Sequence, residues 1–322
     1  MIDILKESRT VRWVGLAAII LIIIGALVPT WVMNNVMFGM ARGLAVLGLM
    51  VLWRTGLISF GHALYFGIGA YAVALADFGL GVSDLFLRLL FAIGASVVVG
   101  FLLGFILRRY RSIFFAMLSL AFSMVLYGIL AKMESLGSTD GFSVTPPTIL
   151  GMEFEDKYAL FVAIIVICFV SACLVQFYLK SALGYLTTAI RDNEIRVEYL
   201  GYSVRRAIHI KYVISAALAG AAGGILASSL GQVDPDSMVN WTVSGELVFV
   251  TIMAGAGSVA APFLGGVVFQ FLQTFSLQYF PDYWQFFEGL TLLLIIFFLP
   301  GGIWSLIQKL WVREDKSPEA AE

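Results

Sequence analysis

Long apolar runs alternate with short polar segments along most of the chain. A helix needs about 20 apolar residues to cross the hydrocarbon core of a membrane. Ten runs approach that length, near residues 13–30, 34–53, 57–77, 86–107, 112–131, 158–179, 208–230, 246–261, 262–280 and 287–307. The runs 246–261 and 262–280 are short, and either could re-enter the membrane instead of crossing it fully. The pattern predicts an all-α, polytopic membrane protein with about ten transmembrane helices and a single domain over residues 1–322.

Positive charge is concentrated on one side of this arrangement. If the ten helices alternate in direction, 16 of the 20 lysines and arginines lie on the same side as the N-terminus. Ten acidic residues, among them Asp140 and Asp234, gather on the other side. Because basic loops are retained in the cytoplasm, both termini are predicted to be cytoplasmic. The main cytoplasmic loop then covers about 180–207 and a short tail covers 308–322, whereas the longest outer loop covers about 132–157.

The ten predicted helices divide into two sets of five. The first set starts on the cytoplasmic side and the second on the outer side, which is the arrangement of an inverted repeat. The two halves share no convincing sequence identity, so the repeat is predicted from topology alone.

Small residues form a stripe along the predicted helix 208–230. Ser215, Ala219, Gly223 and Ala227 recur every four residues, so one side of this helix lacks bulky side chains. Small residues let the backbones of two membrane helices approach closely. The stripe therefore predicts tight packing of this helix against its neighbours.

Composition excludes a soluble protein. Hydrophobic residues make up 60% of the chain and charged residues 13%, with a mean hydropathy of +0.94, whereas soluble domains carry about 25% charged residues. The formal net charge is -1, and both cysteines lie in one apolar run, which indicates neither a disulfide nor a metal site. The chain contains no G-x-x-x-x-G-K-[ST] phosphate-binding loop and no catalytic constellation. We therefore expect no enzymatic activity, no cofactor, no metal and no nucleic-acid partner.

Several motifs follow one another in a characteristic order. The first is RTGLISFGHALYFGIGAY, residues 54–71, in which glycines and one histidine interrupt an apolar run. It is followed by STDGF at 138–142, LG at 183–184, AIRDNE at 189–194 and AGAGS at 254–258. Over about residues 35–305 this series resembles the LivM-type permeases of branched-chain amino acid ATP-binding cassette (ABC) importers, in the LivH/LivM permease family. The last motif departs from the family, where a more glycine-rich turn is expected.

The resemblance implies a transport subunit of the bacterial inner membrane. Such a permease would form half of a translocation pathway together with a LivH-like second permease. It would work with two cytoplasmic ATPase subunits and a periplasmic substrate-binding protein, surrounded by membrane lipid. The cargo would be branched-chain or other amino acids, with urea or short-chain amides as the alternative within the same family. The sequence does not decide between hetero- and homodimeric pairing of permeases.

A transporter of another class is the second hypothesis. An ion-coupled secondary transporter would need acidic residues near the bilayer midplane. The predicted spans place no Asp or Glu there, because Glu246 and Glu288 are expected to reach toward the outer surface. This placement disfavours ion coupling.

Ionisable and small residues within the apolar runs are the candidates for the pathway. Charged side chains inside a membrane are costly, so they mark functional positions. Arg42 is deep enough to require a partner within the bundle or on another subunit. His62 could bond a backbone carbonyl exposed at a broken helical turn, or it could be a structural histidine. The candidates for translocation and gating are Ser59, Gly61, His62, Tyr65, Gly67, Arg42, Gly255 and Gly257.

The cytoplasmic loop contains the candidate coupling element. Residues 186–200 predict one amphipathic helix too short and polar to cross a membrane, with an apolar face that is formed by Leu186, Ala189, Ile190, Val197 and Leu200. Ile195 and Tyr199 lie opposite that face, so the helix has a reason to dock against another protein. The alternative is a helix lying on lipid headgroups. The resemblance implies that the ATPase seats here, on Arg191, Asp192, Asn193, Glu194, Ile195, Arg196, Glu198 and Tyr199.

Overall fold

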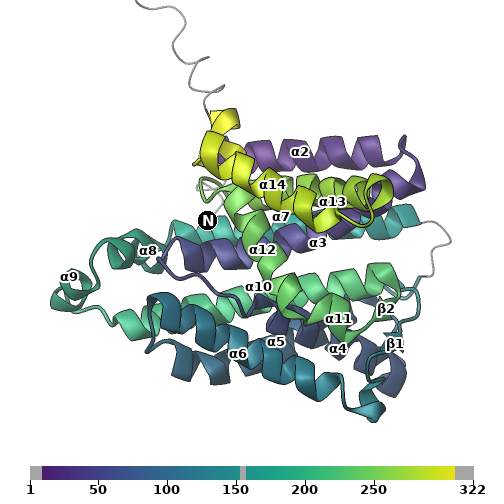
Figure 1. Ribbon diagram of the computed structural model, residues 1–322, viewed down its shortest axis with the longest axis horizontal. Helices are drawn as coiled ribbons and strands as arrows, with labels where there is room; N and C mark the ends of the chain where they lie inside the picture. Colours follow the sequence, from purple (N-terminus) through teal and green to yellow (C-terminus); the bar gives the residue numbers. More distant parts are fainter. Residues whose placement is uncertain (1–8, 153–156, 309–322) are drawn as a thin grey trace, which may run out of the picture.

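Long helices aligned along one axis form the molecule (Figure 1). The structure is a computed structural model that describes residues 9–152 and 157–308. Its elements are α2 (Arg9–Gly25), α3 (Thr30–Trp53), α4 (His62–Leu80), α5 (Leu85–Leu107), α6 (Ser112–Leu130), a 3-10 helix (Glu134–Leu136), β1 (Phe142–Ser143), α7 (Lys157–Leu179), α8 (Ala182–Asp192), α9 (Glu194–Tyr199), α10 (Val204–Leu230), β2 (Gln232–Val233), α11 (Pro235–Met238), α12 (Trp241–Ala254), α13 (Ala261–Tyr279) and α14 (Trp284–Phe298).

The predicted all-α membrane fold is confirmed, and the count of ten spans is not. Each of the ten predicted runs contains a helix. Among the described residues, seven helical segments are long and apolar enough to cross a membrane, with α11 and α12 together forming one of them. The apolar parts of α2 and α14, Val11–Gly25 and Trp284–Phe298, are shorter than that. The predicted tail 308–322 lies outside the described residues except for Gln308, and so do residues 153–156 of the predicted outer loop.

The connections gather at two opposite ends of the bundle (Figure 1). At one end, which we call the α8–α9 end, the guanidinium of Arg54 donates to the carbonyl of Ala256 at 2.6 Å. At the other, the β1–β2 end, Phe142 pairs with Val233 in a two-stranded antiparallel ladder. The helices therefore alternate in direction as the sequence predicts.

Helix pairings recur in the two halves of the chain. Helices α3 and α10 pack against each other at the centre, and α3 contacts α13 as α10 contacts α5. The contacts of α4 with α10 and α5 are matched by those of α12 with α3 and α13, while α2 and α7 contact each other. Equivalent helices of an inverted repeat would pair in this way, so the packing supports the predicted 5+5 arrangement.

The small-residue stripe of α10 lies against the backbones of neighbouring helices. A Cβ atom at Gly223 would collide with the carbonyl of Phe66 on α4, and one at Gly69 would collide with the backbone of Gly220. The tight packing predicted from the stripe is therefore confirmed. In a membrane, where lipid is as apolar as the helices, such close contacts are a main source of stability.

Replacing Gly223 by Val should destabilise the bundle. The new side chain has no space between α10 and α4, and overpacking of a core costs about 1–3 kcal/mol or more. We expect a lower melting temperature of the purified protein, measured by thermal unfolding in detergent. Gly94→Ala on α5 is the matched control, because nothing lies within 4 Å of a Cβ built there, and its melting temperature should not fall. Equal melting temperatures for Gly223→Val and the unmodified protein would contradict this packing.

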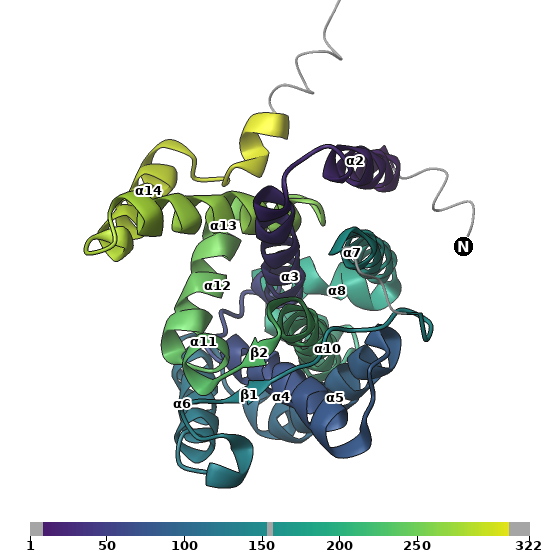
Figure 2. The same cartoon turned by 90° about the vertical axis from the view of Figure 1, so that its right-hand side faces the viewer.

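Several predicted helix boundaries are wrong, among them the end of α14, which lies at Phe298 and not near 307. Helix α4 begins at His62, not near 57, and residues 57–61 pass through the interior without helical structure. Gly56 ends the preceding turn with φ +83, a conformation that L side chains rarely adopt. Helix α12 runs from Trp241 to Ala254 instead of 246–261 and stops at Gly255, where φ is +81. In Figure 2, α7 and α10 are seen end-on, whereas α12 and α13 are seen lengthwise. Helices α12 and α13 are therefore strongly inclined to the bundle axis.

Candidate translocation pathway and coupling site

The signature segment brings several candidates together inside the bundle. Ser59 and His62 are fully buried, and Nε2 of His62 lies 2.7 Å from the hydroxyl oxygen of Ser215 on α10. The expected bond from His62 to a backbone carbonyl is not formed, because the serine hydroxyl occupies its Nε2, and among the described residues its Nδ1 has no partner. Tyr65 donates to the hydroxyl of Tyr212 at 2.8 Å. Gly61 lies against the backbone of Ser119 on α6.

Helices α4 and α12 both begin within the bundle, side by side. The backbone N–H of Ala63 donates to the hydroxyl of Ser244 at 3.1 Å, and Gly67 lies against Val239 just before α12. The chain enters this place from opposite ends of the bundle. Residues 57–61 lead into α4 from the α8–α9 end, and residues 232–239 lead into α12 from the β1–β2 end. Helices interrupted in this way are typical of transporter binding sites, since their first N–H groups are free to meet a substrate. The role of Gly67 and its neighbours in translocation remains a prediction.

Arg42 lies midway along α3 in a polar cluster with α12 and α13. Its Nη1 donates to the side-chain carbonyls of Gln270 at 2.7 Å and Gln273 at 2.6 Å, and its Nη2 lies 3.4 Å from a carboxylate oxygen of Glu246. The predicted need of Arg42 for a partner is confirmed. The expectation that Glu246 reaches the outer surface is wrong, because the inclined α12 carries its carboxylate to the middle of α3. Acidic residues are therefore present at this depth.

A buried ion pair at the β1–β2 end was not predicted. Arg88 on α5 is fully buried, and its Nη2 donates to Asp77 on α4 at 2.6 Å. The same arginine donates to the carbonyls of Val82 and Thr145 at 2.8 Å, so it fastens the connection after α6 to both helices. An arginine within an apolar run was the signal that could have found it.

The predicted single amphipathic helix is two helices. Helix α8 ends at Asp192 and α9 begins at Glu194, because the side chain of Asn193 accepts from the N–H of Arg196 and caps the second helix. Together α8 and α9 form a projection at one end of the bundle, the α8–α9 lobe (Figure 1).

The apolar face of the lobe is confirmed in part. Ile190 and Val197 are buried, as predicted, and Leu186 is half-buried, whereas Ala189 and Leu200 are exposed. Ile195 and Tyr199 are 66% and 88% exposed, as predicted for residues that await a partner. Three further exposed apolar or aromatic side chains of the lobe are Leu183, Tyr185 and Tyr202.

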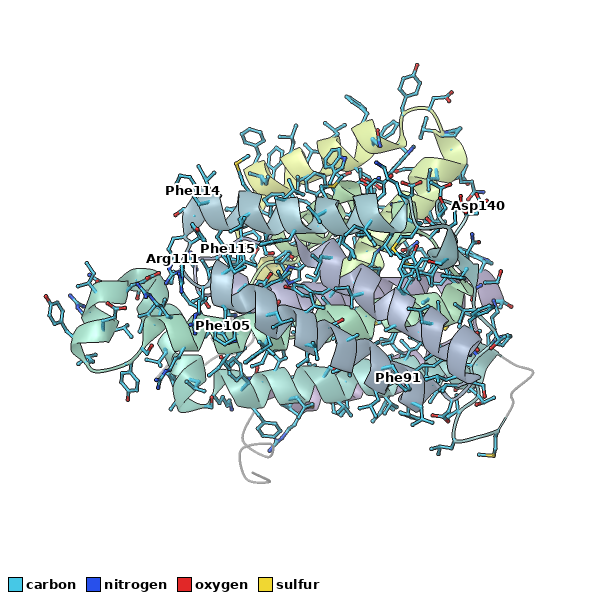
Figure 3. All side chains as sticks on the ribbon, turned by 90° about the horizontal axis from the view of Figure 1, so that it is seen from below. Phe91, Phe105, Arg111, Phe114, Phe115 and Asp140 are labelled. Carbon is cyan, nitrogen blue, oxygen red and sulfur yellow. The ribbon has the colours of Figure 1, made fainter. Side chains whose placement is uncertain are left out.

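Charged residues connect the lobe to the bundle. The Nε of Arg111, at the start of α6, donates to Glu194 at 2.6 Å. Figure 3 shows Arg111 beside the lobe, near Phe115 of α6 and Phe105 of α5. A Cβ atom added at Gly56 would lie 3.5 Å from the Cγ atom of Arg191, so the Arg191 side chain packs beside this glycine. The lobe is therefore in contact with α6 and with the segment that precedes α4.

The glycines after α12 serve close packing. A side chain at Gly255 would collide with the backbone of Gly301, and one at Gly257 would touch Trp304 and Gln308. Arg54 holds the same turn through the carbonyl of Ala256. The role of these glycines in gating remains a prediction.

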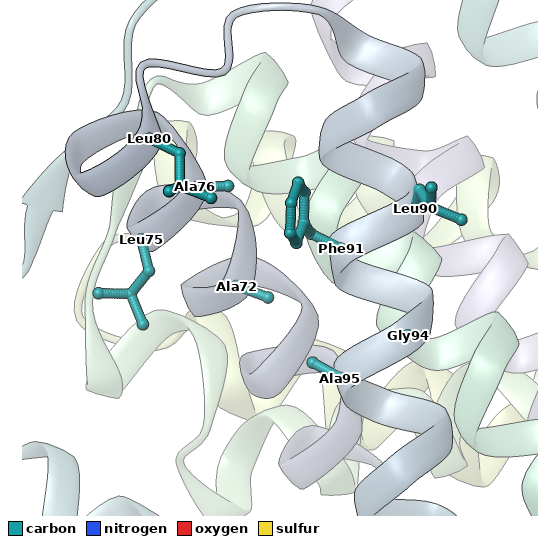
Figure 4. A pocket seen from close by; sticks show the side chains of 8 residues that line it. All are labelled: Ala72, Leu75, Ala76, Leu80, Leu90, Phe91, Gly94 and Ala95. Carbon is teal, nitrogen blue, oxygen red and sulfur yellow. The ribbon is translucent and has the colours of Figure 1, made fainter.

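Apolar hollows on the bundle do not contain the candidates. One, of about 420 Å³, lies between α4 and α5 and is lined by residues that include Ala72, Leu75, Phe91 and Gly94 (Figure 4). Another, of about 380 Å³, is lined by α2, α3, α7 and α13. Within residues 9–152 and 157–308 there is also no group of side chains that could hold a metal ion.

Comparison with known proteins identifies relatives along nearly the whole chain. Residues 31–296 match the family described as branched-chain amino acid transport system / permease component. The high-affinity branched-chain amino acid permease protein LivM of Escherichia coli is 28% identical over 289 residues, which cover 80% of this chain and 67% of LivM. BraD of Pseudomonas aeruginosa is 26% identical, and LivH of Escherichia coli is 22% identical, each covering 84% of this chain and 93% of the relative. No solved structure matches the chain.

Proposed function

This chain belongs to the family of permease components of branched-chain amino acid transport systems, and we propose that it forms half of the translocation pathway of an ATP-driven amino acid importer. The match over residues 31–296 carries the proposal. Permease components of this family are transport subunits and not enzymes. Because its sequence contains no phosphate-binding loop, we assign ATP hydrolysis to separate subunits.

The partners of the proposed importer are a second permease, two ATPases and a binding protein. Similarity to LivM and to LivH, two permeases of Escherichia coli, supports pairing with a LivH-like subunit. The α8–α9 lobe supports ATPase docking, because Tyr199 and Ile195 offer an apolar and aromatic surface that this chain leaves uncovered. The α4 and α12 starts, Ser59 to Gly67 with Ser244, are the proposed site where substrate crosses.

Branched-chain amino acids are the proposed cargo. The names of LivM, BraD and LivH all specify branched-chain amino acid transport. The test is a substrate panel with the complete complex in proteoliposomes, given ATP inside and binding protein outside. We expect uptake of leucine, isoleucine and valine, and no uptake of urea or acetamide. Uptake of urea or acetamide without branched-chain amino acids would assign the chain to the alternative substrates.

The proposed orientation puts the α8–α9 lobe in the cytoplasm of a bacterial inner membrane. Arg54, Arg108, Arg109 and Arg111 accompany the basic residues of the lobe at this end, which is the charge bias of a cytoplasmic side. N- and C-termini are proposed to be cytoplasmic as well.

Cysteine labelling tests this orientation. Single cysteines at Tyr202 and at Thr139, in a protein whose Cys168 and Cys173 are replaced by Ala, should react with an impermeant thiol reagent from opposite sides of the membrane. The cysteine at 139 should react in intact cells, whereas the cysteine at 202 should react only in inverted vesicles. The reverse pattern would invert the proposed topology, and labelling from one side only would contradict the alternation of the helices.

A further inference from the structure

Two carboxylates and one guanidinium lie together in the middle of the bundle. We call Arg42, Glu246, Gln270, Gln273 and Glu288 the mid-bundle cluster. Arg42 is paired with Glu246 and hydrogen-bonded to both glutamines. Glu288, on α14, lies near enough to Glu246, Arg42 and Gln273 to interact with them electrostatically. The cluster therefore contains two carboxyl groups and one guanidinium.

Glu288 is the carboxyl group of the cluster that is least well paired, although Gln273 and Arg42 both interact with it. The residue is only 6% exposed, and among the described residues its Oε1 has no hydrogen-bond partner. A buried carboxyl oxygen without a donor is costly inside a membrane protein. A positively charged ligand or a proton that meets it would reduce that cost.

Glycines with open space adjoin both carboxylates. Gly245 precedes Glu246 and Gly289 follows Glu288, each within a helix, and nothing lies within 4 Å of a Cβ built at either position. A glycine inside a helix costs up to about 1 kcal/mol relative to alanine. The described part of the chain gives no packing reason for either glycine. The two positions leave bare backbone where something outside this chain can approach the carboxylates.

The cluster is also reachable from the surface of the chain. The side chains of Arg42 and Glu246 are 19% and 17% exposed. Contact between these charged side chains and lipid would be energetically costly. A water-filled path closed by the second permease would remove that cost. Within the described residues no acceptor is recorded for Nε of Arg42, so the guanidinium retains a donor for an anionic group.

Resting on the proposed function, we propose that the mid-bundle cluster is a subsite for the zwitterionic end of an amino acid in transit. Glu288 and Glu246 accept hydrogen bonds from its ammonium group, and Arg42 donates to its carboxylate. Because the cluster offers two carboxyl groups and one guanidinium, the ammonium group is the stronger determinant. A ligand that lacks this group should therefore bind less well than one that lacks the carboxylate.

Three small probes separate the two charges. L-leucine, 3-methylbutylamine and 4-methylpentanoate share a branched apolar end and differ in their charged groups. Saturation-transfer NMR is recorded with the complete complex in nanodiscs without the binding protein, which would otherwise bind the probes. We expect leucine and the amine to give signals and 4-methylpentanoate to give a weaker one. In Glu288→Gln the signals of leucine and the amine should fall about tenfold or more, as for loss of one partner of a buried charged contact.

Further variants exclude a purely structural effect. Glu288→Asp retains the charge and should retain much of the amine signal. Asp282→Asn, in the exposed connection before α14, is the matched carboxylate control and should bind as the unmodified complex does. Each variant is scored only if the ATPases co-purify with it. If Glu288→Gln cannot be assembled, Glu246→Gln is measured with the same probes and the same expected loss.

The outcomes separate this subsite from the proposed function. Equal probe signals in Glu288→Gln and the unmodified complex would overturn the subsite, and that result is also expected if Glu288 only carries a proton. Stronger binding of 4-methylpentanoate than of the amine would overturn it too. Absence of leucine uptake by the unmodified complex would instead overturn the cargo assignment, while an amine signal that depends on Glu288 would still establish a cationic subsite.

Discussion

Replacing Asp77 by Ala is expected to prevent stable folding of the chain. Asp77 pairs with the fully buried Arg88 at 2.6 Å and also accepts from the N–H and the hydroxyl of Thr145 at 2.7 Å. Removal of the carboxylate leaves the guanidinium without its ion-pair partner, and breaking a buried ion pair on one side costs about 3–5 kcal/mol. That is a large part of the about 5–15 kcal/mol that stabilises a typical protein.

The yield and melting temperature of the purified permease measure this effect. Asp84→Ala is the control at the same end, because Asp84 caps α5 through the N–H groups of Phe86 and Leu87 and acts on Arg88 without the direct ion pair that Asp77 forms. Loss of such a cap costs about 1 kcal/mol. The double variant Asp77→Ala with Arg88→Met should recover part of the stability, since it removes the unpaired charge. An Asp77→Ala protein as stable as the Asp84→Ala protein would contradict the role of the ion pair.

Replacing Tyr199 and Ile195 by Ala is expected to abolish uptake without unfolding the chain. The two side chains are 88% and 66% exposed, so this chain loses few contacts of its own when they are truncated. If they anchor the ATPase, each truncation costs about 2 kcal/mol or more of association. Together these losses should weaken docking about a thousandfold.

Co-purification of the ATPases and ATP-driven uptake are measured together for this variant. Leu90→Ala is the matched control, because Leu90 is also exposed, at 66%, but lies near the start of α5, at the β1–β2 end. Its assembly and uptake should be those of the unmodified complex. Val197→Asp should give a different defect, since a charge in the buried contact of α9 disturbs the lobe itself. Full assembly and full uptake with both Tyr199 and Ile195 replaced would mean that the lobe does not couple.

The bundle could be predicted from the sequence because membrane thickness fixes helix length and loop charge fixes alternation. Hydropathy could not locate the start of α4, since residues 57–61 are mostly apolar whether helical or extended. The break between α8 and α9 did have a signal. Asn193 followed by Glu194 is a pattern typical of a helix start, and it competes with an amphipathic period that continues through both helices.

The candidate site was less predictable because its contacts are remote in sequence. Arg42 required a partner, but the sequence could not specify Gln270 or Gln273, which lie 228 and 231 residues away. The depth of Glu246 in the bundle depends on the inclination of α12. Hydropathy along the sequence gives the length of a span but not its inclination. His62 with Ser215 is a similar case, since only the crossing of α4 and α10 brings them together.

The energy source is the part of the account that a single measurement tests most directly. Uptake of radiolabelled leucine is compared in proteoliposomes that contain the complete complex or this chain alone, with ATP or with an imposed sodium or proton gradient. The account predicts uptake by the complete complex with ATP, and none by the isolated chain under any gradient. Gradient-driven uptake by the isolated chain would contradict it, and the carboxylates of the mid-bundle cluster would then be the first candidates for an ion-coupling site.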